Sequence, residues 1–128
     1  MPARVHPEFE ITPAQAAMAR ASGRAVIIDV RTQAEWDLVH LPGSVHVPLG
    51  EVADRLDEVE PAPGKDVLVL CHHGRRSLDA VHVLRASGRP DLAHARSIAG
   101  GLEAWSLEAD PSVPRYERGP SGVRLRGA

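Results

Sequence analysis

The feature that most constrains the fold of this chain is a pair of short apolar segments, each followed directly by a helical pattern. The segments are residues 25–30 (AVIIDV) and 66–70 (DVLVL), and their β-branched content is typical of strands buried on both faces of a parallel sheet. Weaker strand patterns are found at 9–11, 44–47 and 93–98. Helical patterns are found at 13–22, 33–38, 48–59, 77–87 and 102–105. This alternation predicts an α/β domain with a mostly parallel central sheet flanked by helices.

The length of the chain suits a single domain with its own core. It has 128 residues, of which 43% are hydrophobic and 25% charged, as in ordinary globular proteins. The residues after Tyr116 are rich in Gly, Pro, Ser and Arg and show no periodicity. We therefore expect an N-terminal extension at 1–8, one domain at 9–116 and a flexible C-terminal tail at 117–128. A monomer is the expected state, because a domain of this length can bury a sufficient core alone.

Charge and hydropathy exclude several classes of partner. The formal net charge is −2, so there is no strong basic field to hold a nucleic-acid backbone. No apolar run is long enough to span a membrane, and residues 1–10 lack the apolar core and cleavage site of a secretory signal. We expect a cytoplasmic protein that binds neither nucleic acid nor membranes.

The only cysteine, Cys71, lies where α/β folds place their reactive groups. It directly follows the strand at 66–70 and precedes a loop and a helix expected to begin near Ser77, with that serine as N-cap. Loop N–H groups and a helix N-terminus stabilise negative charge, and Arg75 and Arg76 add positive charge. Such surroundings favour a thiolate, which is the nucleophilic form of cysteine. A lone cysteine is often an inert buried residue, but an inert residue needs no anion-binding loop, so Cys71 is the predicted nucleophile.

Two histidines follow the cysteine in the loop. His72 and His73 add positive charge if protonated, and we expect them to line the rim of the pocket and tune its charge near neutral pH. A metal site is not expected, because adjacent side chains rarely converge on one ion and the chain has no second cysteine.

Charged residues lie at the end of the first apolar segment and just after it, and Asp29 and Arg31 should therefore lie at the same sheet edge as Cys71. We expect Asp29 and Arg31 to hold in place the residues that contact the substrate. Glu35 is either the partner of Arg31 or a solvated helix residue. Arg76 has two equally supported roles. It binds an anionic substrate, or it pairs with Asp29 to hold the loop.

Residues 71–77 (CHHGRRS) resemble the active-site loop of rhodanese domains, in which a cysteine is followed by two variable residues, a glycine, one variable residue and then arginine or threonine. Cys71, Gly74 and Arg76 fill the fixed positions, and Arg75 fills a variable one. The resemblance implies that the whole loop binds the substrate and that Arg75 helps to select it.

Three further segments agree with the same family in the same order, so the resemblance extends over about residues 9–116. One departure is Val39, where the family usually has glycine before the histidine of its second signature. The segments are DVR at 29–31 with Glu35, HLPGS at 40–44, and Gly100-Gly101 with Trp105. The family fold is a three-layer domain with a mostly parallel five-stranded sheet.

The resemblance implies a sulfurtransferase that needs no metal and no organic cofactor. Cys71 would take the outer sulfur of thiosulfate or a related donor, hold it as a persulfide and pass it to cyanide, a thiol or a sulfur-carrier protein. The segment 110–116 (DPSVPRY) resembles an ending found in rhodanese domains fused to enzymes that activate ubiquitin-like proteins, which points to a carrier protein.

Two other functions compete with this interpretation. A cysteine phosphatase or arsenate reductase needs an arginine after five intervening residues, but that position holds Ser77 and the arginine comes one place early. A catalytically silent binding or regulatory module usually lacks the cysteine, which is present here.

Overall fold

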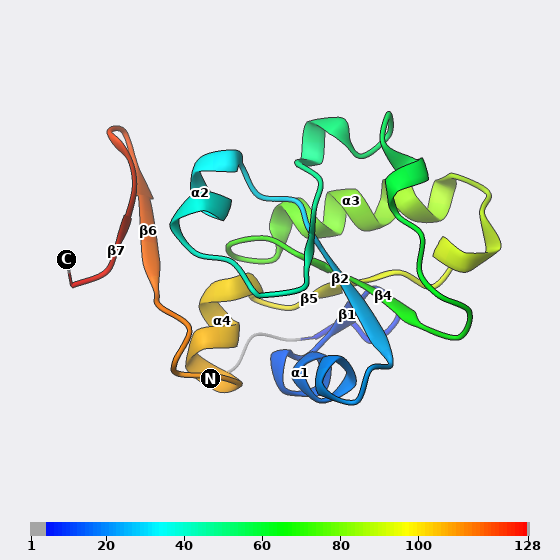
Figure 1. Ribbon diagram of the computed structural model, residues 1–128, viewed down its shortest axis with the longest axis horizontal. Helices are drawn as coiled ribbons and strands as arrows, with labels where there is room; N and C mark the ends of the chain where they lie inside the picture. Colours follow the sequence, from blue (N-terminus) through cyan, green and yellow to red (C-terminus); the bar gives the residue numbers. More distant parts are fainter. Residues whose placement is uncertain (1–4, 128) are drawn as a thin grey trace.

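A five-stranded parallel sheet forms the centre of the protein in the computed structural model, which describes residues 5–127 (Figure 1). The strand order is β1-β5-β4-β2-β3. The strands are β1 (Glu10–Ile11), β2 (Ala25–Asp29), β3 (Val45–His46), β4 (Asp66–Leu70) and β5 (Arg96–Ile98). The helices are α1 (Pro13–Ala21), α2 (Gln33–Leu38), α3 (Arg75–Ala86) and α4 (Gly101–Glu108). Helices α1 and α4 cover one face and α3 the other, so the predicted three-layer α/β fold is confirmed.

The two strands β2 and β4 are apolar at nearly every position because each face of the sheet has its own core. Ile28 and Val69 pack into the cluster on the α3 side, whereas Ile27, Leu68 and Leu70 pack against α1 and α4. Side chains of a strand point alternately to the two faces, so a strand covered on both sides must be apolar at every position.

The first two helices begin where the sequence predicts. Thr12 caps α1 and Thr32 caps α2, and each threonine side chain accepts the N–H of the third helical residue, Gln15 or Glu35. The side chains of Gln15 and Glu35 bond back to the cap N–H groups, so both caps form complete capping boxes.

The prediction of a helix at 48–59 is wrong. Two short 3₁₀ turns, Leu49–Glu51 and Leu56–Glu58, take its place. Val52 and Val59 of the predicted apolar face are nevertheless buried in the core. Gly50 and the β-branched valines have low helix propensity, and burial of the valines does not require a continuous helix.

The C-terminal segment also differs from the prediction of a flexible tail at 117–128. Strands β6 (Tyr116–Gly119) and β7 (Gly122–Leu125) form an antiparallel hairpin beside α2 (Figure 1). Tyr116 is buried, and Val123 and Leu125 pack against the core on the α1 and α4 side. Three apolar residues among arginines and glycines gave too weak an alternation to predict these strands. Of the expected extension at 1–8, residues 1–4 lie outside the described part of the chain, as does residue 128 of the expected tail.

None of the helices within residues 5–127 has the length and apolar character required to cross a membrane.

Candidate active site

The sheet register brings the predicted site residues to one edge. Asp29 is paired with Leu70, the last residue of β4, and the N–H of Val30 donates to the carbonyl of Leu70 at 2.9 Å. Strands β2 and β4 therefore end at the same level. Arg31 and Cys71 follow at this edge, where parallel sheets place their ligand sites.

The sulfur of Cys71 has two polar neighbours. The backbone N–H of Gly74 donates to Sγ at 3.0 Å, and Ser77 Oγ lies 3.3 Å from Sγ. Ser77 Oγ in turn lies 2.6 Å from Ser97 Oγ, a residue that the sequence did not point to because it lies inside a short strand. A thiolate accepts hydrogen bonds only, so Ser77 must donate to it and Ser97 must then donate to Ser77. Gly74 N–H and this hydroxyl chain both stabilise negative charge on the sulfur.

Helix α3 begins nearer to Cys71 than predicted. Gly74 precedes its first residue, Arg75, so the expectation that Ser77 caps this helix is wrong. Gly74 has φ +92°, and a Cβ atom at this position would lie 2.9 Å from the backbone N of Gly100. The glycine permits both the turn and the close contact. Ser77 consequently lies in the first turn of α3, where its buried side chain faces the sulfur.

The first turn of α4 holds the cysteine loop from the other side. The N–H of Leu102 donates to the carbonyl of Cys71 at 2.8 Å, and the N–H of Glu103 donates to that of His72 at 3.1 Å. These are N–H groups that a helix N-terminus leaves without partners inside the helix. The adjacent Gly101 has φ +64°, and a Cβ atom there would lie 2.4 Å from the Cys71 carbonyl oxygen.

We predict that Gly101→Ala disrupts the cysteine loop. The left-handed backbone costs an alanine about 1–2 kcal/mol, and the contact with the Cys71 carbonyl adds to this, so we expect a total loss of about 3 kcal/mol or more in the free energy of unfolding. Urea unfolding measures it. Gly64→Ala is the matched control, because Gly64 has φ +81° but no atom within 4 Å of a Cβ at that position. Equal losses in the two variants would contradict the proposed contact.

The two inner arginines each pair with a carboxylate, but not in the expected combinations. Arg31 pairs with Asp29, with Nη2 2.7 Å from Oδ2 and Nε 2.9 Å from Oδ1. Arg76 donates to both oxygens of Glu35, at 2.7 and 2.9 Å. Glu35 is thus neither the partner of Arg31 nor a solvated residue, and Arg76 does not pair with Asp29. The pair of Glu35 and Arg76 ties α2 to the first turn of α3, directly after the loop.

Tyr116 completes this network, although the sequence gave it no role. Its hydroxyl donates to Glu35 and accepts a hydrogen bond from Arg31 at 3.3 Å, and its ring stacks on His72 at 4.1 Å between centroids. Burial raises the pKa of Tyr116, so it remains a donor. Burial alone would raise the pKa of Glu35 as well, but the hydrogen bonds from Arg76 and Tyr116 lower it to about 2. Tyr116 is the only tyrosine of the chain and follows a proline-rich segment, which is the one signal that could have drawn attention to it.

His72 is buried, with only 5% of its surface exposed, and does not tune charge near neutral pH as expected. Burial, and to a smaller extent the neighbouring His73, lowers the pKa of His72 to about 4. Among residues 5–127, its Nδ1 atom has no hydrogen-bond partner. His73 is exposed at the rim, and Arg75 is exposed on α3. No group of three or more His, Cys, Asp or Glu side chains within the same residues could hold a metal ion.

We predict that this histidine makes the protein less stable at mildly acidic pH. Its folded pKa of about 4 lies below the ordinary 6.5, so the unfolded chain binds the proton first and stability is lost as the pH falls from 6.5 to 4. The free energy of unfolding should drop by about 2 kcal/mol between pH 7 and pH 5. His72→Gln should remove most of this drop, whereas replacing the exposed His94 by Gln should not. A drop that is unchanged in His72→Gln would refute the assignment.

Comparisons with known proteins point to one family. The family model of the rhodanese-like domain matches residues 12–108. The adenylyltransferase and sulfurtransferase MOCS3 of Arabidopsis thaliana is 34% identical over 105 residues, which covers 71% of this chain and 22% of that protein. The chain therefore spans only about a fifth of the length of this relative.

Solved structures of similar size share the fold. The human single-domain sulfurtransferase TSTD1 is 25% identical with a TM-score of 0.66, and the match covers 77% of this chain and 96% of that one. RPA3614 from Rhodopseudomonas palustris, described as a possible tyrosine phosphatase, is 27% identical with a TM-score of 0.67 and 85% coverage of both chains. The family match ends before the C-terminal hairpin, so Tyr116 and β7 lie outside it.

Proposed function

The chain belongs to the rhodanese-like domain family, and on this basis we propose that it transfers a sulfane sulfur through a persulfide on Cys71. The observation that carries the proposal is the setting of the sulfur. Sγ accepts the Gly74 N–H at 3.0 Å, one residue before the N-terminus of α3. A helix N-terminus and an inward N–H favour an anionic sulfur, whether thiolate or persulfide.

The proposed reaction consists of two displacements. The Cys71 thiolate attacks the outer sulfur of thiosulfate, the sulfur–sulfur bond of the donor breaks, and sulfite leaves with the electron pair. The persulfide that remains carries one negative charge on its terminal sulfur. A nucleophile such as cyanide then attacks that sulfur, thiocyanate leaves, and the thiolate is restored. No electrons are gained or lost overall, so neither step requires a redox cofactor.

The burial of Cys71 limits the acceptors. Only 1% of its surface is exposed, so an acceptor must be small or must present a slender group. Cyanide and a small thiol meet this requirement, and so does the extended end of a sulfur-carrier protein. The MOCS3 relatives combine an adenylyltransferase with a sulfurtransferase by name, which supports the carrier protein as the physiological acceptor.

A phosphatase or arsenate reductase reaction is the weaker alternative. Such a reaction needs an arginine that is free to bind the equatorial oxygens of the oxyanion. Arg76 is held by both oxygens of Glu35, and the next position is Ser77. The loop therefore lacks the arginine that this chemistry requires.

Initial-rate measurements test the proposal. We expect thiocyanate formation from thiosulfate and cyanide, with parallel double-reciprocal lines at several fixed cyanide concentrations, because the donor product leaves before the acceptor binds. Hydrolysis of para-nitrophenyl phosphate, measured in parallel, should be absent. Phosphate release without thiocyanate formation would overturn the proposal in favour of the phosphatase. If folded protein shows neither activity, with 3-mercaptopyruvate also tried as donor, the catalytically silent binding module becomes the better interpretation.

A further inference from the structure

We propose that Arg118, on the C-terminal hairpin, binds the oxyanion end of an anionic sulfur donor. This inference rests on the proposed sulfur transfer and adds a residue that selects the substrate. Thiosulfate is a dianion, and its charged end must find a cation near Cys71.

The inner cations of the site are occupied. Arg31 is buried against Asp29, and Arg76 donates two hydrogen bonds to Glu35. Either arginine would have to leave a buried carboxylate without its partner in order to bind a substrate, which is costly. His72 is neutral at pH 7, because burial lowers its pKa to about 4. Arg76 is therefore engaged in holding the loop through Glu35, and we expect another cation to bind the anion.

The strand geometry of the hairpin directs Arg118 toward the site. Residues two apart on a strand lie on the same face, so Arg118 shares the face of Tyr116, whose hydroxyl bonds to Glu35. Arg118 Nε lies 3.8 Å from Glu35 Oε1, which is beyond hydrogen-bond distance, and 48% of its side chain is exposed. It is therefore close to the carboxylate that holds the loop, yet loosely held and accessible to solvent.

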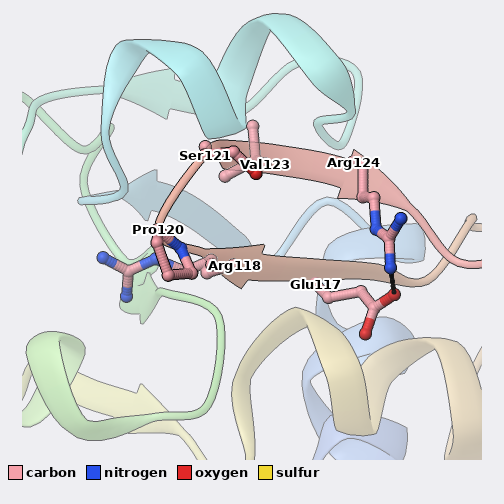
Figure 2. A pocket seen from close by; sticks show the side chains of 8 residues that line it. Glu117, Arg118, Pro120, Ser121, Val123 and Arg124 are labelled. Atoms are coloured by element: carbon pink, nitrogen blue, oxygen red, sulfur yellow. Dashed lines mark ion pairs between the residues drawn. The ribbon is translucent and has the colours of Figure 1, made fainter.

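The other charged residues of this part of the hairpin neutralise each other. Glu117 and Arg124 are cross-strand partners joined by an ion pair of 3.2 Å. Figure 2 shows the Arg118 side chain extending away from this pair. Because Arg124 neutralises Glu117 beside Arg118, a control with the same charge is taken from elsewhere: Arg24 is exposed and directly precedes β2, at the edge of the sheet opposite Cys71.

A pocket beside the cysteine loop provides the space for the anion. Arg118 lines it together with Arg126, His72, His73 and Tyr116. The acidic residues of this pocket are compensated, because Glu103 pairs with Arg115 and Glu117 pairs with Arg124. Both arginines that line the pocket lie beyond the part of the chain that matches the family, and Arg118 is the one that lies 3.8 Å from Glu35, the carboxylate that holds the loop.

The test compares two donors of different charge. For thiosulfate, Arg118→Gln should lower kcat/KM about tenfold, and Arg118→Lys should restore part of the loss, because a charge-assisted hydrogen bond is removed or replaced. For an alkyl persulfide, whose only charge lies on the sulfur that is transferred and which has no oxyanion end, kcat/KM should stay within about twofold of the unaltered protein. Arg24→Gln should leave both values unchanged. Thermal unfolding of each variant checks that the hairpin variants remain folded.

Each outcome decides between distinct conclusions. An unaltered protein that transfers sulfur, together with an Arg118→Gln variant that uses thiosulfate equally well, overturns the role of Arg118 alone. An equal loss with both donors shows a structural role and also overturns it. If the unaltered protein takes sulfur from neither donor, the proposed function itself fails.

Discussion

Replacing Cys71 by serine should reduce sulfur transfer by about a thousandfold or more while leaving the fold intact. The hydroxyl is a far weaker nucleophile than a thiolate near neutral pH, and a serine cannot form a persulfide. The substitution is nearly isosteric, and the Gly74 N–H and Ser77 Oγ can bond to an oxygen as they do to the sulfur. Thiocyanate formation gives the rate, and thermal unfolding monitors the fold.

The single cysteine makes the control for this experiment simple. Iodoacetamide can alkylate only one thiol in this chain, so alkylation of the unaltered protein should abolish transfer to the same extent. A Cys71→Ser variant that retains more than about a tenth of the activity would show that the sulfur is carried elsewhere.

The second large effect is expected for Glu35→Ala. The carboxylate is fully buried and accepts hydrogen bonds from Arg76, Tyr116 and Thr32. Removing it leaves the guanidinium of Arg76 without its partner in a partly buried position, and breaking such a pair typically costs about 3–5 kcal/mol. We expect a loss of this size in urea unfolding, and weaker sulfur transfer because the first turn of α3 is no longer held.

An exposed pair provides the comparison. Glu58 also pairs with an arginine, Arg55, but here the arginine side chain is 31% exposed and the glutamate side chain 47%, whereas Glu35 is fully buried. Glu58→Ala should therefore leave the stability nearly unchanged, because water and salt already screen that interaction. Similar losses in Glu35→Ala and Glu58→Ala would mean that the buried network does not hold the cysteine loop.

The sequence predicted the parts of the fold that depend on local patterns. The central strands were found because burial on both faces makes residues 25–30 and 66–70 apolar at nearly every position. The starts of α1 and α2 were found because Thr12 and Thr32 satisfy backbone N–H groups through their own side chains. The prediction of a helix at 48–59 was wrong because the valines of this segment show a helical spacing whether or not the backbone between them is helical.

The site was predictable as a location but not as a set of contacts. The position of Cys71 follows from the strand that precedes it, since parallel strands direct their carboxyl ends to one edge. The pairing of Glu35 with Arg76 joins residues 41 positions apart, and its bond to Tyr116 spans 81. Such contacts depend on how α2, α3 and the hairpin pack, and no local pattern in the chain encodes that packing.

The most direct test of the central claim is the intact mass of the reduced protein after incubation with thiosulfate. We expect a gain of one sulfur atom, about 32 Da, that is lost on addition of cyanide and never appears in Cys71→Ser. This result would establish the Cys71 persulfide as the carrier of the sulfur. A folded protein with a reactive thiol that gains no sulfur from thiosulfate, 3-mercaptopyruvate or an alkyl persulfide would contradict the account.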